Sequence, residues 1–225
     1  MKISKPSYRP LIHGDIVKRA NLFRYIRDFI EMQNMETGCY MEFGILNGEC
    51  MIDAYRQFRG MTSHFYGFDS FEGLPELSNE DQFSAKLTPI FSKGNYTSMK
   101  QEFVRESILS SCRMLSEELT LTKGFFNESL PAFSSSAENN KVKPINIAYI
   151  DCDLYSSTVD VLKFIEDKVV SGTWILFDDY WCYRGSPMHG QQKAIREWLD
   201  RYKRIGLQPY CNFDGWGRAF IVYEN

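Results

Sequence analysis

The sequence predicts a doubly wound α/β fold: a sheet of seven strands, mostly parallel, with an antiparallel last strand. Two observations support this prediction. Short apolar, β-rich runs alternate with helical patterns along most of the chain, as they do in α/β sheets. Runs such as "IAYI" and "WILF" are apolar at every position, which is typical of parallel strands buried on both faces. Only the last two β-rich runs follow each other directly, and "DGWG" between them predicts an antiparallel hairpin at the edge of the sheet.

The elements follow in chain order. Strands are predicted over residues 39–45, 64–68, 119–122, 145–150, 173–177, 208–213 and 218–223. Helical patterns cover residues 15–33, 48–58, 96–109, 157–168 and 191–205. The long segment 75–95 is predicted to be irregular, and loops of this length often act as lids over binding sites.

Composition narrows the function classes. The 225 residues predict a single domain, with a helical segment over residues 1–37 ahead of the main body, residues 38–225. A net charge of -3 provides no basic field for a nucleic acid. The six cysteines are scattered without metal-finger spacing, and we expect them to be reduced. The sequence shows neither a signal-peptide pattern nor an apolar run of membrane-spanning length, which predicts a cytoplasmic protein without a membrane partner.

The first strand ends in an E-x-G-x-x-x-G pattern formed by Glu42, Gly44 and Gly48. Glycine lets a ligand approach the backbone closely, but this spacing fits pyrophosphate-binding fingerprints poorly. S-adenosylmethionine carries an ammonium and a sulfonium instead of phosphate, so a carboxylate at the strand end suits it electrostatically. A tight turn from strand to helix explains the same three residues equally well.

The second strand ends at Asp69, followed by Ser70, in "FDSFEGLP". An acidic residue at this place in a doubly wound fold can accept hydrogen bonds from both hydroxyls of a ribose. Taken alone, Asp69 is more often a turn or helix-capping residue. Together with the glycine turn of the first strand, Asp69 and Ser70 predict a nucleoside site.

Two further strands end in paired aspartates, Asp151 with Asp153 and Asp178 with Asp179. If the strand continues past Asp151, the first pair projects from one face of it. Adjacent strands lie roughly 4.8 Å apart, so up to four carboxylates meet at one edge of the sheet. Carboxylates this close need a counterion or a raised pKa, and oxygen ligands favour Mg²⁺. Some of these residues are also plausible helix caps.

Several motifs then resemble a known family. "EFGILNG", "FDSFEGLP", "LTKGFFNESLP", "YIDCDLYSST", "ILFDDY", "GQQKAIREWL" and "FDGWGRAF" occur in the order seen in macrocin-type (TylF-like) O-methyltransferases. The resemblance covers about residues 38–223. It implies a class I methyltransferase, with a Rossmann-like fold, that uses S-adenosylmethionine and Mg²⁺ to methylate a hydroxyl of a sugar or glycosylated small molecule.

The resemblance also implies roles for individual residues. Asp151, Asp178 and Asp179 would hold the metal, and Asp153 would be the general base. Gly124 and Phe125 would lie on the adenine side of the cofactor pocket, and the 1–37 segment would form part of the acceptor pocket. The sequence departs from the family at Glu49, where many relatives have a small residue, and before residue 38 the match is loose.

Alternatives stay open at this stage. A catechol-type phenol methyltransferase is the nearest, although that group commonly ends the second metal-binding strand in Asp-Asn. A nucleotide-sugar glycosyltransferase would also explain the D-x-D of "YIDCD", and a fold that only binds nucleoside would not use the aspartates at all. His189 is a second candidate for the base, His13 has no assigned role, and a homo-oligomer is compatible with the sequence.

Overall fold

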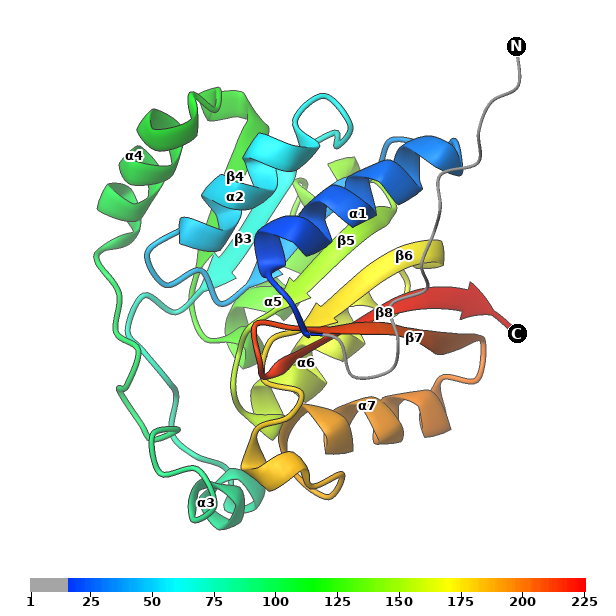
Figure 1. Cartoon of the computed structure of the whole chain (residues 1–225). Helices are drawn as coiled ribbons and strands as arrows, with labels where there is room; N and C mark the ends of the chain where they lie inside the picture. The colour runs from blue at the N-terminus through cyan, green and yellow to red at the C-terminus, as the bar shows by residue number, and fades with distance from the viewer. Residues whose placement is uncertain (1–15) are drawn as a thin grey trace.

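A computed structural model describes residues 16–225 and shows one eight-stranded sheet between two layers of helices (Figure 1). The strand order is β1-β7-β8-β6-β5-β2-β3-β4. All neighbouring strands are parallel except β8, which is antiparallel to both β6 and β7. The strands are β1 (Ile16–Val17), β2 (Cys39–Phe43), β3 (Phe65–Asp69), β4 (Leu119–Lys123), β5 (Ile145–Ile150), β6 (Val169–Phe177), β7 (Ile205–Phe213) and β8 (Gly217–Glu224). The predicted doubly wound sheet with an antiparallel last strand is confirmed.

The sheet differs from the prediction at the β8 side. The last strand does not lie at the edge, because β8 pairs with β6 on one side and with β7 on the other. Ala219, Phe220 and Val222 of β8 are all buried, which fits an interior position. The two-residue strand β1, which the sequence did not predict, pairs with β7 and forms the outer edge. Strand β6 also begins earlier than predicted and passes through Gly172, whose φ of 92° bends the strand near its start.

Six helices cover the two faces of the sheet. Helices α1 (Arg19–Met32), α2 (Glu49–Phe58) and α4 (Gln101–Cys112) pack on one face. Helices α5 (Phe126–Ser134), α6 (Tyr155–Ile165) and α7 (Gly190–Arg201) pack on the other. Short 3₁₀ turns occupy Ser116–Glu118, Asn139–Lys141 and Tyr183–Gly185. The helical pattern of α5 escaped prediction, since Pro131 lies inside the helix and reads as a helix breaker.

Helix α1 belongs to the main core. Leu22, Phe23, Ile26 and Ile30 recur at the spacing of one helix face, and each is at most 4% exposed. They join the same cluster as Trp174 of β6. Residues 16–37 are therefore an integral layer of a single folded unit. No helix within residues 16–225 is long and apolar enough to cross a membrane.

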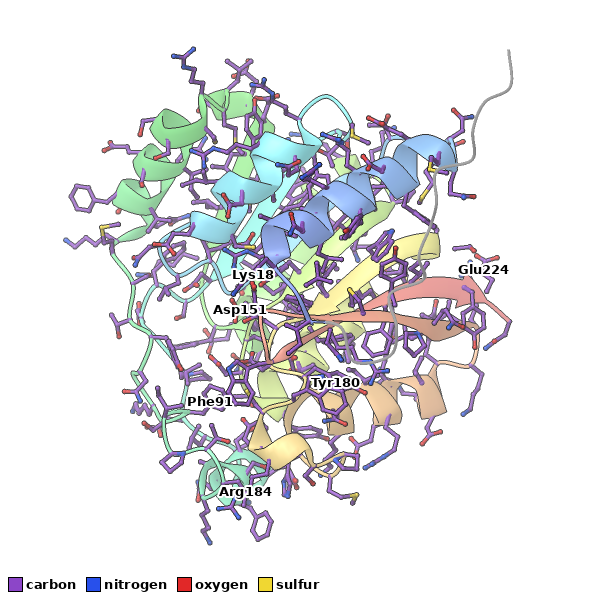
Figure 2. The ribbon with its side chains drawn as sticks, in the orientation of Figure 1. Lys18, Phe91, Asp151, Tyr180, Arg184 and Glu224 are labelled. Atoms are coloured by element: carbon purple, nitrogen blue, oxygen red, sulfur yellow. The ribbon has the colours of Figure 1, made fainter. Side chains whose placement is uncertain are left out.

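Residues 75–95, predicted to be irregular, form with Leu74 a folded excursion between β3 and α4, the 74–95 segment, which contains the short helix α3 (Asn79–Ala85). Its two ends are joined by backbone hydrogen bonds from Leu74 N to Asn95 O, 2.9 Å, and from Gly94 N to Leu74 O, 3.0 Å. Leu74 and Phe91 pack with Leu154 and Tyr183 in a small separate core. Figure 2 shows Phe91 between Asp151 and the α3 region.

Candidate active site

The carboxyl ends of β2, β3, β5 and β6 border one cavity of about 1210 Å³. This is the place where ligands bind in open α/β sheets. The 74–95 segment forms part of its wall, together with the start of α5 and one side of α6. Nine of the predicted site residues line it: Gly44, Asp69, Ser70, Gly124, Phe125, Asp151, Asp153, Asp178 and Asp179. Glu42 and Gly48 are not among the lining residues.

The glycines after β2 are required by close packing. Gly44 has a φ of 92°, and a Cβ there would stand 1.7 Å from the backbone oxygen of Asp151. Gly48, with a φ of 86°, precedes α2, and a Cβ there would stand 2.5 Å from Ile108 of α4. Gly44 thus holds the β2 turn against the residue that begins the acidic loop, while Gly48 lets α2 approach α4.

Glu42 lies behind the cavity wall. Its side chain is fully buried, and the hydroxyl of Tyr40 donates a 2.6 Å hydrogen bond to its Oε2. Its other oxygen, Oε1, has no hydrogen-bond partner among the described residues. Burial raises the pKa of Glu42 to about 7, although the Tyr40 hydroxyl and the nearby Arg19 guanidinium oppose the shift. In this structure Glu42 is buried at the end of β2 and does not line the cavity. Its direct contact with a cofactor stays a prediction.

Asp69 bridges the ends of β2 and β3. Its Oδ2 accepts hydrogen bonds from the backbone amides of Ile45, 2.7 Å, and Leu46, 3.0 Å. Its Oδ1 accepts a 2.6 Å bond from the amide of Phe71. The Ser70 hydroxyl closes the turn that follows β3 by donating to the carbonyl of Gly73. Asp69 therefore fixes the glycine turn as well as facing the cavity.

The first aspartate pair is brought together in an unexpected way. Strand β5 ends at Ile150, and Asp153 has a left-handed φ of 58°, so the strand does not continue through the pair. The chain folds back instead: the amide of Asp153 donates to Asp179 Oδ2 at 3.0 Å, and the hydroxyl of Tyr183 donates to the carbonyl of Asp153. The condition stated from the sequence, a strand that continues past Asp151, is therefore not met.

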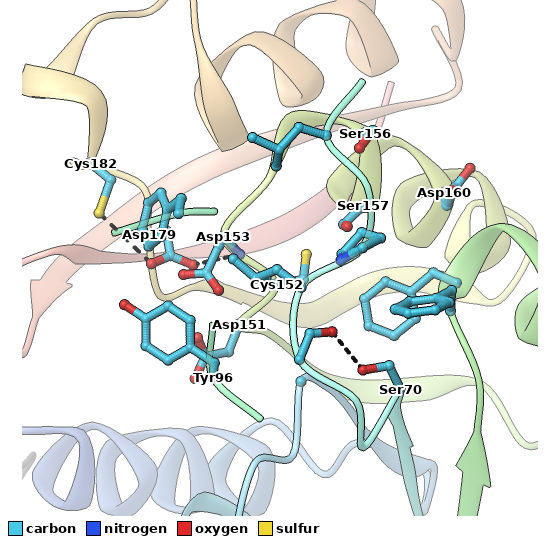
Figure 3. A pocket seen from close by; sticks show the side chains of 18 of the residues that line it. Ser70, Tyr96, Asp151, Cys152, Asp153, Ser156, Ser157, Asp160, Asp179 and Cys182 are labelled. Atoms are coloured by element: carbon cyan, nitrogen blue, oxygen red, sulfur yellow. Dashed lines mark hydrogen bonds between the residues drawn. The ribbon is translucent and has the colours of Figure 1, made fainter. Parts of the chain in front are cut away.

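Three carboxylates meet at this bend. One oxygen each from Asp151, Asp153 and Asp179 lies within 4.8 Å of the other two, as the labelled side chains in Figure 3 show. Burial and mutual repulsion raise the pKa of all three well above the usual range. A set of crowded carboxylate oxygens is the donor chemistry that suits a hard divalent cation, so these residues fit Mg²⁺.

Asp178 lines the cavity but stands outside this group of three. The hydroxyl of Tyr149 donates a hydrogen bond to its Oδ1. The guanidinium of Arg19, which lies 5.9 Å from the centre of the Tyr149 ring, favours the ionised form of Asp178. The grouping in the structure thus contains Asp153 in the place that the prediction gave to Asp178, and the predicted ligand set stays a prediction.

Tyr96, Arg184 and Trp216 are among the lining residues that were not predicted as site residues. Tyr96 and Arg184 approach from the two segments that meet near α3, and Trp216 lies at the turn between β7 and β8. Burial raises the pKa of the Tyr96 hydroxyl to about 12, and the negative charge of nearby Asp153 is the second cause of this shift. The sequence signal that could have pointed to Tyr96 is its position directly after the segment 75–95, which was predicted to act as a lid.

His189, the second candidate for the base, does not join the site. His189 is not among the lining residues; its Nδ1 lies 2.9 Å from the Ser84 hydroxyl, and its ring stacks on Phe83 of α3. His13 lies outside the described residues. None of residues 16–37 lines the cavity. Residues 1–15 lie outside the described part, and the share of the 1–37 segment in an acceptor pocket stays a prediction.

The sheet order, with its antiparallel last strand, and a cavity at the carboxyl ends of the parallel strands define a class I, Rossmann-like methyltransferase fold. Solved structures of methyltransferases share this fold. The O-methyltransferase NovP is 20% identical, with a TM-score of 0.69 over 90% of this chain and 78% of that one. CalS11, the calicheamicin methyltransferase, is 20% identical, with a TM-score of 0.70 over 90% and 77%.

The chain belongs to the macrocin-O-methyltransferase (TylF) family, whose model matches residues 15–206. Demethyldecarbamoylnovobiocin O-methyltransferase of Streptomyces niveus is 25% identical over 112 residues, which are 50% of this chain and 40% of the relative. The 8-demethyl-8-(2,3-dimethoxy-alpha-L-rhamnosyl)-tetracenomycin-C 4'-O-methyltransferase of Streptomyces olivaceus is 23% identical over 150 residues, 66% of this chain and 51% of the relative. These matches thus span about half the length of the curated relatives. The resemblance stated from the motifs is confirmed.

Proposed function

We propose that the protein transfers the methyl group of S-adenosylmethionine to a hydroxyl of a saccharide or glycosylated small molecule, with Mg²⁺ as a second cofactor. One observation carries the proposal. A single cavity contains both the turn built on Gly44 and Asp69 and the carboxylates of Asp151, Asp153 and Asp179. A nucleoside-type site next to an acidic, oxygen-only site is the arrangement that metal-assisted O-methyl transfer needs.

The cofactor half of the site is assigned to four residues that line the cavity. Asp69 and Ser70 end β3, and Gly124 and Phe125 end β4 just before α5. In the proposal Asp69 accepts from the ribose, and Gly124 and Phe125 border the adenine. Phe125 offers an apolar surface, and Gly124, with a φ of 135°, adopts a conformation that glycine tolerates best.

The acceptor half is assigned to the aspartates. Asp151, Asp178 and Asp179 are proposed to hold the metal. A bound divalent cation supplies positive charge that lowers the pKa of an alcohol hydroxyl and orients it. Asp153 is proposed to take the proton as the hydroxyl attacks the sulfonium methyl. Its backbone is fixed by Asp179 and Tyr183, which keeps the carboxylate directed at the cluster.

The names of the relatives support a glycosylated acceptor. The tetracenomycin enzyme is named for methylation of a compound that carries a substituted rhamnosyl group, and one solved structure of CalS11 is described as that of a TDP-rhamnose 3'-O-methyltransferase. We carry only the class, a saccharide hydroxyl, to this chain as part of the proposal.

The test measures methyl transfer directly. Protein is incubated with methyl-labelled S-adenosylmethionine, Mg²⁺ and a panel of glycosides, nucleotide sugars and catechols, and calorimetry measures binding of S-adenosylmethionine and S-adenosylhomocysteine. We expect both cofactor forms to bind and label to enter a saccharide. Transfer to catechols alone would move the acceptor to the phenol class. Absence of cofactor binding, with binding of a nucleotide sugar and Mn²⁺, would overturn the methyltransferase proposal.

A further inference from the structure

Asp160 is a cavity-lining acidic residue without a role in the proposed transfer. Asp160 lies on α6, and with Ser156 and Ser157 it forms the side of that helix that borders the cavity. Residues three and four apart share a helix face, which explains why these three appear together. In Figure 3 Asp160 lies on the opposite side of the view from Asp153 and Asp179, toward Ser70.

The carboxylate of Asp160 lacks a donor. The residue is partly buried, and within residues 16–225 its side chain forms no hydrogen bond and no ion pair. Burial raises the pKa of Asp160, and Lys163 opposes this shift only in part. A partly desolvated carboxylate without donors is unfavourable, and one that lines a binding cavity can gain its missing donor from the ligand.

The neighbouring elements indicate which part of a ligand would reach Asp160. Helix α5 packs beside α6, with Leu130 and Phe133 in the same core cluster as Val161. Two of the cavity-lining residues at the start of α5 are the aromatic Phe125 and Phe126, so a flat ring resting there has α6 beside its edge. The proposed cofactor carries one such ring, an adenine, whose exocyclic amine is a hydrogen-bond donor.

We propose that Asp160 accepts a hydrogen bond from the 6-amino group of the adenine of S-adenosylmethionine and makes the pocket select a 6-aminopurine over a 6-oxopurine. This inference rests on the proposed cofactor and adds a specificity residue to it. Carboxylates read exocyclic amines in the same way when proteins recognise cytosine. A 6-oxopurine would bring a carbonyl oxygen toward the carboxylate and lose the bond.

The test compares two ligands that differ only at this position, S-adenosylhomocysteine and S-inosylhomocysteine, by calorimetry at pH 8. Wild type should bind the adenosyl ligand roughly 10- to 100-fold more tightly. Asp160→Asn should bind the two ligands within about three-fold of each other, because an amide can either accept from an amine or donate to a carbonyl.

Glu128→Gln is the matched control. Glu128 is also an acidic residue of the cavity wall, at the start of α5, but it is exposed to solvent. We expect this variant to keep the wild-type preference. A wild type that binds both ligands equally, or an Asp160→Asn variant that keeps the full preference, would overturn the inference and leave the methyltransferase proposal intact. Failure of wild type to bind S-adenosylhomocysteine at all would overturn both.

Discussion

Replacing Asp69 by alanine is expected to destabilise the fold as well as to weaken cofactor binding. The carboxylate accepts hydrogen bonds from the amides of Ile45, Leu46 and Phe71. All three donors would lose their acceptor at once, and the turn after β2 would lose its connection to β3. The effect should therefore appear even when no ligand is present.

The structure sets the size of the effect. The amides of Ile45 and Phe71 bond in partly buried surroundings, and that of Leu46 is exposed. A hydrogen bond to a charged group contributes roughly 1.5 to 3 kcal/mol, and water can replace part of the loss at an exposed site. We expect the free energy of unfolding to fall by about 2 to 4 kcal/mol for Asp69→Ala. In a chain of this size that loss lowers Tm by roughly 4 to 16 °C.

Ligand binding should also change. A carboxylate offers about four acceptor sites, and three amides already use Asp69. In this conformation the residue has room for about one ribose hydroxyl, which corrects the expectation that it accepts from both. Loss of that bond and loosening of the turn should weaken S-adenosylhomocysteine binding by roughly 1 to 3 kcal/mol.

Urea unfolding and calorimetry measure the two effects. Asp69→Asn keeps one acceptor oxygen and should lie between wild type and Asp69→Ala. Asp200→Asn makes the same change at an exposed site paired with Lys203, and it should change the free energy of unfolding by less than about 0.5 kcal/mol. If Asp69→Ala unfolds within about 0.5 kcal/mol of wild type, with an unchanged slope against urea, the bridging role of Asp69 is refuted.

Three further expectations concern the base, the metal and pH. Asp153→Asn should lower kcat by about 10² to 10⁴ with little change in affinity for S-adenosylmethionine or Mg²⁺, whereas His189→Ala should do much less; the reverse result would make His189 the base. Chelator should abolish activity and Mg²⁺ restore it, with more Mg²⁺ needed by Asp178→Asn and Asp179→Asn, and full turnover by metal-free protein would contradict the site. Burial raises the pKa of Glu42 to about 7, so the folded state holds this proton more tightly than the unfolded chain, and the resulting stability is lost as pH rises through that value. Relative to wild type, Glu42→Gln should gain roughly 2 to 3 kcal/mol between pH 5 and pH 8 in urea unfolding, and a loss over that range would disprove the assignment.

The sequence predicted the strands that form the centre of the sheet because their signals are strong. Residues 147–150 and 174–177 are apolar throughout, and the structure places strands there. Strand β1 has only two residues and exists through pairing with β7, so no local pattern marks it. Helix α5 was not predicted; it contains Pro131, a residue that usually breaks helices, and the core contacts of Leu130 and Phe133 hold the helix together around it.

The site was predictable at strand ends and less so where the chain leaves regular structure. Position alone placed Gly44, Asp69 and Asp179 at the cavity. The left-handed bend at Asp153 was not predictable, because it depends on hydrogen bonds with residues that are distant in the sequence. Tyr96 and Asp160 were likewise outside any motif, since a side chain that enters a cavity from a long segment or a helix has no characteristic spacing.

The closed base of the 74–95 segment makes that segment an exchangeable module. The backbone bonds between Leu74 and the pair Gly94 and Asn95 bring the two ends together, so the rest of the fold receives the same chain geometry whatever lies between them. A replacement would have to keep the contacts that join the segment to the rest of the fold. These include the packing of Leu74 and Phe91 against Leu154 and Tyr183, and the 2.9 Å hydrogen bond that Asp81, fully buried, accepts from the amide of Tyr155 at the start of α6. Segments of other lengths that retain these contacts are expected to be accepted at the same two points without a change in the sheet, because loop length alone costs little.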